Sequence, residues 1–145
     1  MNENTWPFIL ICGGLLVFLL AGCRVAAAYP LLCPESEIQE AAIVQIRYDG
    51  ELHEETVGTV DAAETLAAFR QVQVYHWYGE PLAPVYENTE AVLRLTYADG
   101  SVEWINWNGQ AHSTPDRGFR FYAGYYVFDE QAFRDFLDGL DTSPA

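Results

Sequence analysis

Two stretches of alternating apolar and polar residues form the clearest pattern in the chain, and each leads into an Asp-Gly pair. Residues 43–48 precede Asp49-Gly50, and residues 92–97 precede Asp99-Gly100. Alternation is typical of a strand, because successive side chains point to opposite faces. Asp-Gly between two such runs indicates a tight hairpin, since both residue types tolerate the positive φ that the turn demands. The pattern therefore predicts two β-hairpins.

A capped helix is predicted after each hairpin. Asp61 with Glu64 three residues later fits a capping box, and Leu66 and Phe69 supply a buried stripe. The second helix is predicted to begin at Asp129. Its apolar face follows the i, i+3, i+4, i+7 spacing, with Phe133, Phe136, Leu137 and Leu140. Phe128, just before the helix, is placed to form a hydrophobic staple with Phe133. Gly139 is expected to end the helix.

The remaining segments complete an α+β prediction. Residues 72–79 and the two halves of residues 119–128 read as strands, whereas residues 80–90 and 108–117 read as loops. We expect an antiparallel sheet of about five to six strands with two helices packed on one face. The fold then consists of two strand-hairpin-plus-helix units, and whether they are a true duplication stays open.

An uncharged apolar run from Phe8 to Cys23 opens the chain. A spanning helix needs about 20 apolar residues, so this run is short for a permanent anchor and is typical of an export signal. The preceding residues contain no Lys or Arg, and Arg24 follows the run directly, which departs from the usual charge pattern of signals. An uncleaved membrane helix that ends in cysteine is the alternative.

The last four residues of the run are Leu20-Ala21-Gly22-Cys23, an aliphatic residue and two small residues before a cysteine. This tetrapeptide resembles the lipobox of bacterial lipoproteins, and the chain resembles the small lipoproteins found especially in Gram-positive bacteria. The resemblance implies a lipid on the Cys23 thiol and cleavage between Gly22 and Cys23. It also implies an extracytoplasmic protein held at the cell membrane by that lipid, because several acyl chains on one residue anchor firmly.

These boundaries divide the chain into four parts. Residues 1–22 are the expected signal peptide, and residues 23–40, with two prolines and no sustained period, are an expected lipidated tether. A single α+β domain is expected over residues 41–141, followed by a frayed tail at 142–145. Of the other cysteines, Cys12 leaves with the signal and Cys33 has no partner in the mature chain, which favours an inert thiol or an intermolecular bridge.

The charge balance narrows the range of partners. Without the signal, which contains Glu3, 20 acids face 7 bases, and every base is arginine. This acidity argues against binding to nucleic acid. Anionic headgroups would also repel the domain, so lipid rather than charge has to hold it at the membrane.

Aromatic residues are the candidate contact residues for a partner. Trp104 and Trp107 are expected on opposite faces of one strand, and Tyr75 shares a face with Trp77. If helices cover only one face of the sheet, one tryptophan is exposed on the open side. Exposed Trp and Tyr can anchor a protein partner or stack on a cell-wall sugar. The alternative is that they fill the core and its rim.

No catalytic motif stands out. The histidines lie in different predicted elements at no metal-ligand spacing: His53, His76 and His112. Asp99, Ser101 and Glu103 occupy alternate positions, but the sequence around them lacks the twelve-residue pattern of an EF-hand calcium loop. We therefore expect neither a metal site nor a cofactor, and a binding or accessory module rather than an enzyme. A small carbohydrate-active hydrolase is the alternative, which requires a concave pocket with two convergent carboxylates.

Overall fold

The computed structural model describes residues 9, 11, 13, 24–77, 89–122 and 126–144. Nearly all of the expected signal peptide, Cys23 and most of the expected loop at 80–90 lie outside these residues. Within the described part of the chain, no helix is long and apolar enough to cross a membrane.

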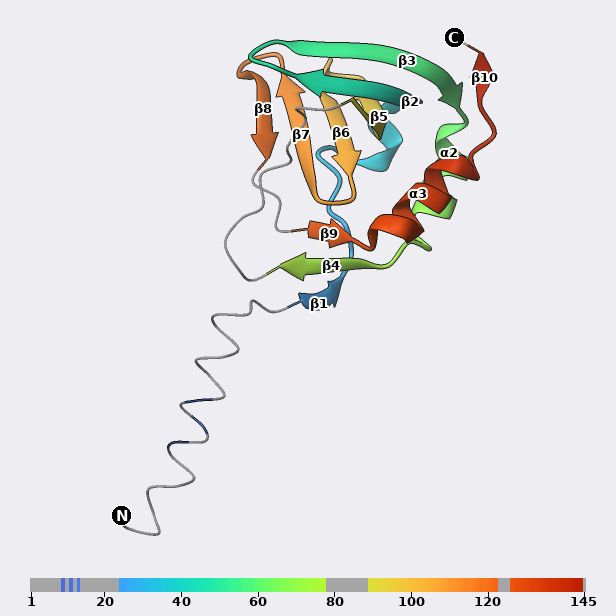
Figure 1. The fold of residues 1–145 in the computed structure, drawn as a ribbon. Helices are drawn as coiled ribbons and strands as arrows, with labels where there is room; N and C mark the ends of the chain where they lie inside the picture. The colour runs from blue at the N-terminus through green and yellow to red at the C-terminus, as the bar shows by residue number, and fades with distance from the viewer. Residues whose placement is uncertain are drawn as a thin grey trace.

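A large antiparallel sheet forms the body of the fold (Figure 1). Its strand order is β10-β3-β2-β5-β6-β7-β8. The strands are β2 (Ile38–Tyr48), β3 (Leu52–Val60), β5 (Glu90–Tyr97), β6 (Val102–Asn106), β7 (Gly109–Thr114), β8 (Gly118–Tyr122) and β10 (Ser143–Pro144).

A smaller sheet and two helices lie against the large sheet (Figure 1). The small sheet has the order β1-β4-β9 and is also antiparallel. Its strands are accompanied by two α-helices and a short 3-10 helix: β1 (Arg24–Ala27), β4 (Val74–Trp77), β9 (Tyr126–Phe128), α2 (Ala62–Phe69), α3 (Glu130–Asp138) and η2 (Glu35–Glu37). The α+β class is confirmed, but the ten described strands in two sheets exceed the five or six expected.

Both predicted hairpins are confirmed, with one difference in their turns. Tyr48 pairs with Leu52 across the first turn, and Thr96 pairs with Val102 across the second. Only the glycines take positive φ, 107° at Gly50 and 85° at Gly100. The turn therefore needs the freedom of glycine at one position, while the aspartate before it keeps an ordinary conformation.

Both helix starts are confirmed as side-chain caps. Asp61 Oδ1 accepts the backbone N–H of Glu64 at 2.8 Å, and Asp129 Oδ1 accepts that of Ala132 at 2.9 Å. Each cap satisfies a backbone donor that has no partner within the helix. Phe128 and Phe133 also make the predicted staple, with ring centroids 5.1 Å apart.

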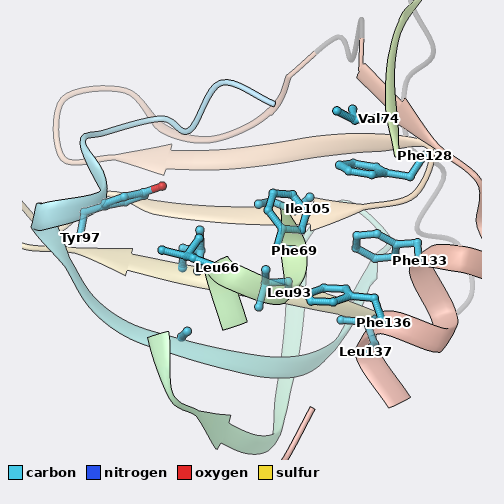
Figure 2. Packing of buried hydrophobic residues seen from close by; sticks show 12 residues of the cluster. Leu66, Phe69, Val74, Leu93, Tyr97, Ile105, Phe128, Phe133, Phe136 and Leu137 are labelled. Carbon is cyan, nitrogen blue, oxygen red and sulfur yellow. The ribbon is translucent and has the colours of Figure 1, made fainter. Parts of the chain in front are cut away.

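The main core lies between the large sheet and the layer formed by the helices and small sheet. Figure 2 shows the phenylalanine rings of α2, α3 and β9 facing apolar side chains of the large sheet. The buried members include Leu66, Phe69, Leu93, Ile105, Phe128, Phe133, Phe136 and Leu137. This packing confirms the predicted apolar faces of both helices.

The opposite face of the large sheet is also covered, contrary to the expectation of an open face. A second cluster there includes Val44, Ile46 and Trp104, the last with only 5% of its surface exposed. The ring of Tyr48 on β2 lies 5.4 Å from that of Phe119 on β8, although three strands separate β2 from β8 in the sheet order. The sheet therefore curls until its own strands cover this face.

Three further segments differ from their predictions. Residues 109–114, within the expected loop at 108–117, form β7, which lies between two other strands. The expected tether is not separate from the domain, because β1 pairs with β4 and residues 29–33 pack on the main core. Ser143 and Pro144, expected to be frayed, pair with Thr59 and Gly58 of β3.

Candidate functional site

A segment between β1 and β2 crosses the helix-covered side of the large sheet. We call residues 28–34 the strap. The Tyr29 hydroxyl donates to Glu103 Oε1 at 2.6 Å, and the backbone N–H of Leu32 donates to Glu103 Oε2 at 3.1 Å. Glu103 lies on β6 in the middle of the sheet. One carboxylate therefore fastens the strap to residues more than 70 positions away in the sequence.

Glu103 is a buried acid whose partners are mainly neutral. It is 4% exposed and accepts a third hydrogen bond from the Tyr97 hydroxyl at 2.7 Å. Burial raises the pKa of Glu103, while its hydrogen bonds and His112 on the neighbouring strand oppose that rise. Among the ion pairs of the described residues, none includes Glu103. Glu103 therefore has a structural role, because its hydrogen bonds connect the strap to the large sheet.

Aromatic packing around Tyr29 also holds the strap in place. The Tyr29 ring lies 5.5 Å from the ring of Phe69 on α2 and 5.8 Å from that of Phe128 on β9, measured between centroids. It also meets the Tyr126 ring edge-on at 5.8 Å. Such edge-on and tilted arrangements are the favoured geometries of aromatic pairs. Tyr29 thus joins the strap to α2, to the small sheet and, through Glu103, to the large sheet.

An apolar hollow of about 900 Å³ lies between the strap and α2, and we call it the strap hollow. Apolar side chains from both elements, from β4 and from β9 line it: Leu31, Leu32, Leu66, Phe69, Val74 and Phe128. Arg70 and Glu35, also in its lining, form an ion pair, with 61% and 43% of their side chains exposed. The hollow therefore has an apolar wall and a charged, solvent-facing rim.

Cys33 is half-buried and lies in the wall of the strap hollow. Burial raises the pKa of its thiol, and the carboxylates of Asp99, Glu37 and Glu103 raise it further. A raised pKa keeps the thiol protonated at neutral pH, and the thiolate is the reactive form. The surroundings of Cys33 therefore do not support a nucleophile.

Two smaller hollows contain further grouped polar side chains. One, of about 200 Å³, lies on the other side of the strap and includes Glu103, Gln110 and His112 in its lining. Gln110 is 2% exposed and donates to the backbone oxygen of Tyr126, which connects β7 to β9. The other, of about 320 Å³, lies beside α3 and includes the carboxylates of Glu90 and Asp138.

The structure does not bring the four predicted aromatic contact residues onto one face. Trp104 is buried in the second cluster, and its indole N–H donates to Glu54 of β3. Trp107 lies in the turn after β6, half-buried against the main core. Tyr75 and Trp77 lie on β4 of the small sheet, both half-buried. Of the four residues, only Tyr75 and Trp77 lie on the same strand.

Arginine and acids on the curled face of the large sheet form a network around Trp104. Arg94, with 17% of its side chain exposed, pairs with Glu40 of β2 and Glu54 of β3. Because Glu54 accepts from both Arg94 and Trp104, the network closes the rim of the second cluster. In the described part of the chain, no group of His, Cys, Asp and Glu side chains could hold a metal ion.

Comparisons with protein-family models, with curated proteins and with solved structures find no match to this chain.

The sequence pattern did not identify Glu103 and Tyr29 as partners. On an alternating strand, an acid beside Trp104 reads as a solvent-facing residue. One feature could have indicated the packing: residues 29–33 are Tyr-Pro-Leu-Leu-Cys, more apolar than a solvated tether needs. The buried position of Glu103 depends on that segment lying over β6.

Proposed function

We propose that the protein is a lipid-anchored accessory or binding module outside the cytoplasmic membrane, without catalytic activity. The observation that carries the proposal is the tetrapeptide Leu20-Ala21-Gly22-Cys23 at the end of an uncharged apolar run. Its small residues let a peptidase approach the backbone, and its thiol can carry a lipid. The acidic charge of the remaining chain makes a lipid necessary, since anionic membranes would otherwise repel it.

The start of the fold gives this anchor a mechanical consequence. β1 begins at Arg24, the residue after Cys23, and pairs with β4 along its whole length. A lipid on Cys23 would therefore hold the small sheet directly at the membrane surface. The residues expected to form a flexible tether instead form β1 and the strap, which pack on the domain.

A protein or cell-wall partner at the membrane surface would then meet the aromatic residues of the small sheet. Tyr75 and Trp77 on β4 are half-buried, so part of each residue remains accessible. Tyr and Trp are enriched in energetically important contacts because they bury a large area at low entropic cost. Trp104 is not a candidate, since it is 5% exposed.

Carbohydrate hydrolysis is a weaker candidate. That chemistry needs two carboxylates flanking one bond. The strap hollow has a single carboxylate, Glu35, which pairs with Arg70. Of the three hollows described above, only the one beside α3 contains two, and there Glu90 is already hydrogen-bonded to the Asn106 amide. The grouped acids are therefore better explained as structural partners.

Mass spectrometry of the protein from bacterial membranes tests the anchor. Cells are grown with a labelled fatty acid, and the N-terminal peptide of the mature protein is sequenced. We expect the label on a peptide that begins at residue 23. A Cys23→Ser variant should lose the label and retain Met1, because serine cannot form the thioether.

Cys33→Ser is the matched control, since it removes a thiol outside the tetrapeptide. It should be labelled and cleaved like the wild type. An intact Met1 peptide in the mature wild-type protein, or label retained after Cys23→Ser, would contradict the proposal.

A further inference from the structure

We propose that the strap hollow holds one of the fatty acyl chains attached to Cys23, so that the lipid both anchors the domain and fixes its orientation. This inference rests on the proposed function, because it requires a lipid at that position. It goes beyond anchoring by assigning a binding site for the lipid within the fold.

The size and chemistry of the hollow suit an acyl chain. Its volume of about 900 Å³ is at the upper end of the range for ligand pockets. At about 30 Å³ per carbon, close to the volume of a water molecule, a sixteen-carbon chain needs roughly 500 Å³. The accessible part of the wall offers the half-buried apolar side chains of Leu31, Leu32 and Val72, which match a hydrocarbon chain.

The position of Cys23 points to its own lipid as the occupant. Ala27, the last residue of β1, lines the hollow, and Cys23 directly precedes the first residue of that strand. Four residues of extended chain span at most about 14 Å. An extended palmitoyl chain is longer than this, so its terminal carbons can enter the hollow from Cys23 without any change in the fold.

The free energy favours a seated chain. An acyl chain that moves from the bilayer into the hollow exchanges one apolar environment for another, so its own transfer is close to neutral. The half-buried apolar residues of the wall, Leu31, Leu32 and Val72, meanwhile lose their contact with water, which is the favourable term of the hydrophobic effect. Since lipoproteins of this kind carry two or three chains, the others stay in the bilayer and maintain the anchor.

The charged rim fits the same orientation. Arg70 and Glu35 pair with each other while most of the Arg70 side chain faces solvent. With the strap and α2 turned toward the membrane, this pair would lie at the level of the polar headgroups. Long side chains such as arginine keep their charged end in water while their stem covers apolar surface.

Photocrosslinking of the lipid tests the inference in the full chain, in its native membranes. Cells incorporate a palmitic acid analogue with a diazirine along its chain, the membranes are irradiated, and crosslinked peptides are mapped. We expect crosslinks on the strap and on residues 66–74, while other faces of the domain should remain free of them.

Substitutions that fill the hollow provide the decisive comparison. Ala28 and Gln73 are exposed residues that line it, so Ala28→Trp and Gln73→Trp add bulk there without disturbing the buried core. Each should lower the crosslinks on the strap roughly tenfold, as loss of about 1.4 kcal/mol of binding would. The matched control is Ala63→Trp, an exposed position of α2 outside the lining, which should leave the crosslinks unchanged.

The outcomes separate this inference from the proposed function. Label on Cys23 with crosslinks only to bilayer lipids, or spread evenly over the domain, would overturn the seated chain and leave the anchor intact. Crosslinks that persist in both filled variants would also overturn it. Absence of label on Cys23 would overturn both proposals.

Discussion

A buried carboxylate normally requires compensation for the water that it loses, and Glu103 obtains it largely from neutral donors. Two phenol hydroxyls and one backbone N–H point at its oxygens. Hydrogen bonds to a charged acceptor are stronger than neutral ones, so the two contacts from Tyr29 and Leu32 hold the strap more firmly than ordinary ones would. The cost of burial nevertheless outweighs their effect on the carboxyl, since the pKa of Glu103 lies above its usual range.

A Glu103→Gln variant should reveal this cost as a difference in pH dependence. A raised pKa means that the folded state holds the proton more tightly than the unfolded state. Glu103 therefore contributes most stability below its unfolded pKa, about 4.3, and this contribution declines as the pH rises through the folded pKa. The free energy of unfolding of the wild type minus that of the variant should fall with rising pH, by at most about 1.4 kcal/mol per pH unit.

Urea unfolding of both proteins from pH 4 to 8 measures that difference. The variant can keep its contacts, because the Tyr29 hydroxyl can accept from the new amide while the amide oxygen accepts from Tyr97 and Leu32. Glu55→Gln, at an exposed position of β3, is the charge-matched control. A difference that rises with pH would contradict the assigned direction.

Among the elements, β3 shows how the fold protects the edge of its large sheet. β3 pairs with β2 along its length, while the short β10 covers only its end. Gly58 lies at this contact, where an added Cβ would come within 2.9 Å of the Ser143 carbonyl oxygen. An uncovered edge strand is open to pairing with another chain, so the C-terminal residues restrict that exposure.

The effect of Gly58→Ala on the free energy of unfolding should therefore change sign when the C-terminal residues are removed. In the full chain we expect a loss of about 1–3 kcal/mol in the free energy of unfolding, because the new methyl group clashes with backbone. In a chain that ends at Asp141, the same substitution should be stabilising by about 0.5–1 kcal/mol, since alanine loses less backbone entropy than glycine.

Thermal or urea unfolding of the four proteins completes this double-mutant cycle. Equal effects of Gly58→Ala in the long and the short chain would show that β10 does not occupy the edge of β3.

At the scale of the whole molecule, the curl of the large sheet replaces a second layer of helices. The main core uses α2, α3 and the small sheet as its cover, whereas the second cluster is closed by β8 bending toward β2. The Tyr48 ring meets Phe121 edge-on at 4.9 Å and stacks with Phe119 at 5.4 Å. Bending the sheet lets this domain bury both of its faces with few helices.

Phe119→Ala tests whether β8 closes the second cluster. We expect a loss of about 2–4 kcal/mol in the free energy of unfolding, because the ring packs on Tyr48, Trp104 and Phe121. Arg120→Ala, the exposed neighbour on the same strand, should stay within about 0.5 kcal/mol of the wild type. A Phe119 variant as stable as the Arg120 variant would indicate a flat sheet with an open face.

The sequence by itself determined the elements whose causes are local. The hairpins at Gly50 and Gly100 depend on adjacent residues, and the caps at Asp61 and Asp129 depend on backbone groups three residues away. The buried faces of α2 and α3 follow from helical spacing alone. The α+β class was predictable for the same reason.

Only the tertiary structure decided which polar and aromatic residues are buried. β7 reads as a loop because its sequence, GQAHST, has little apolar alternation, and it becomes a strand through pairing with β6 and β8 on either side. Trp104 is covered by the curl of strands far from it in sequence, and Glu103 by a strap more than 70 residues earlier. Burial of this kind depends on contacts between distant segments, which no periodicity along the chain encodes.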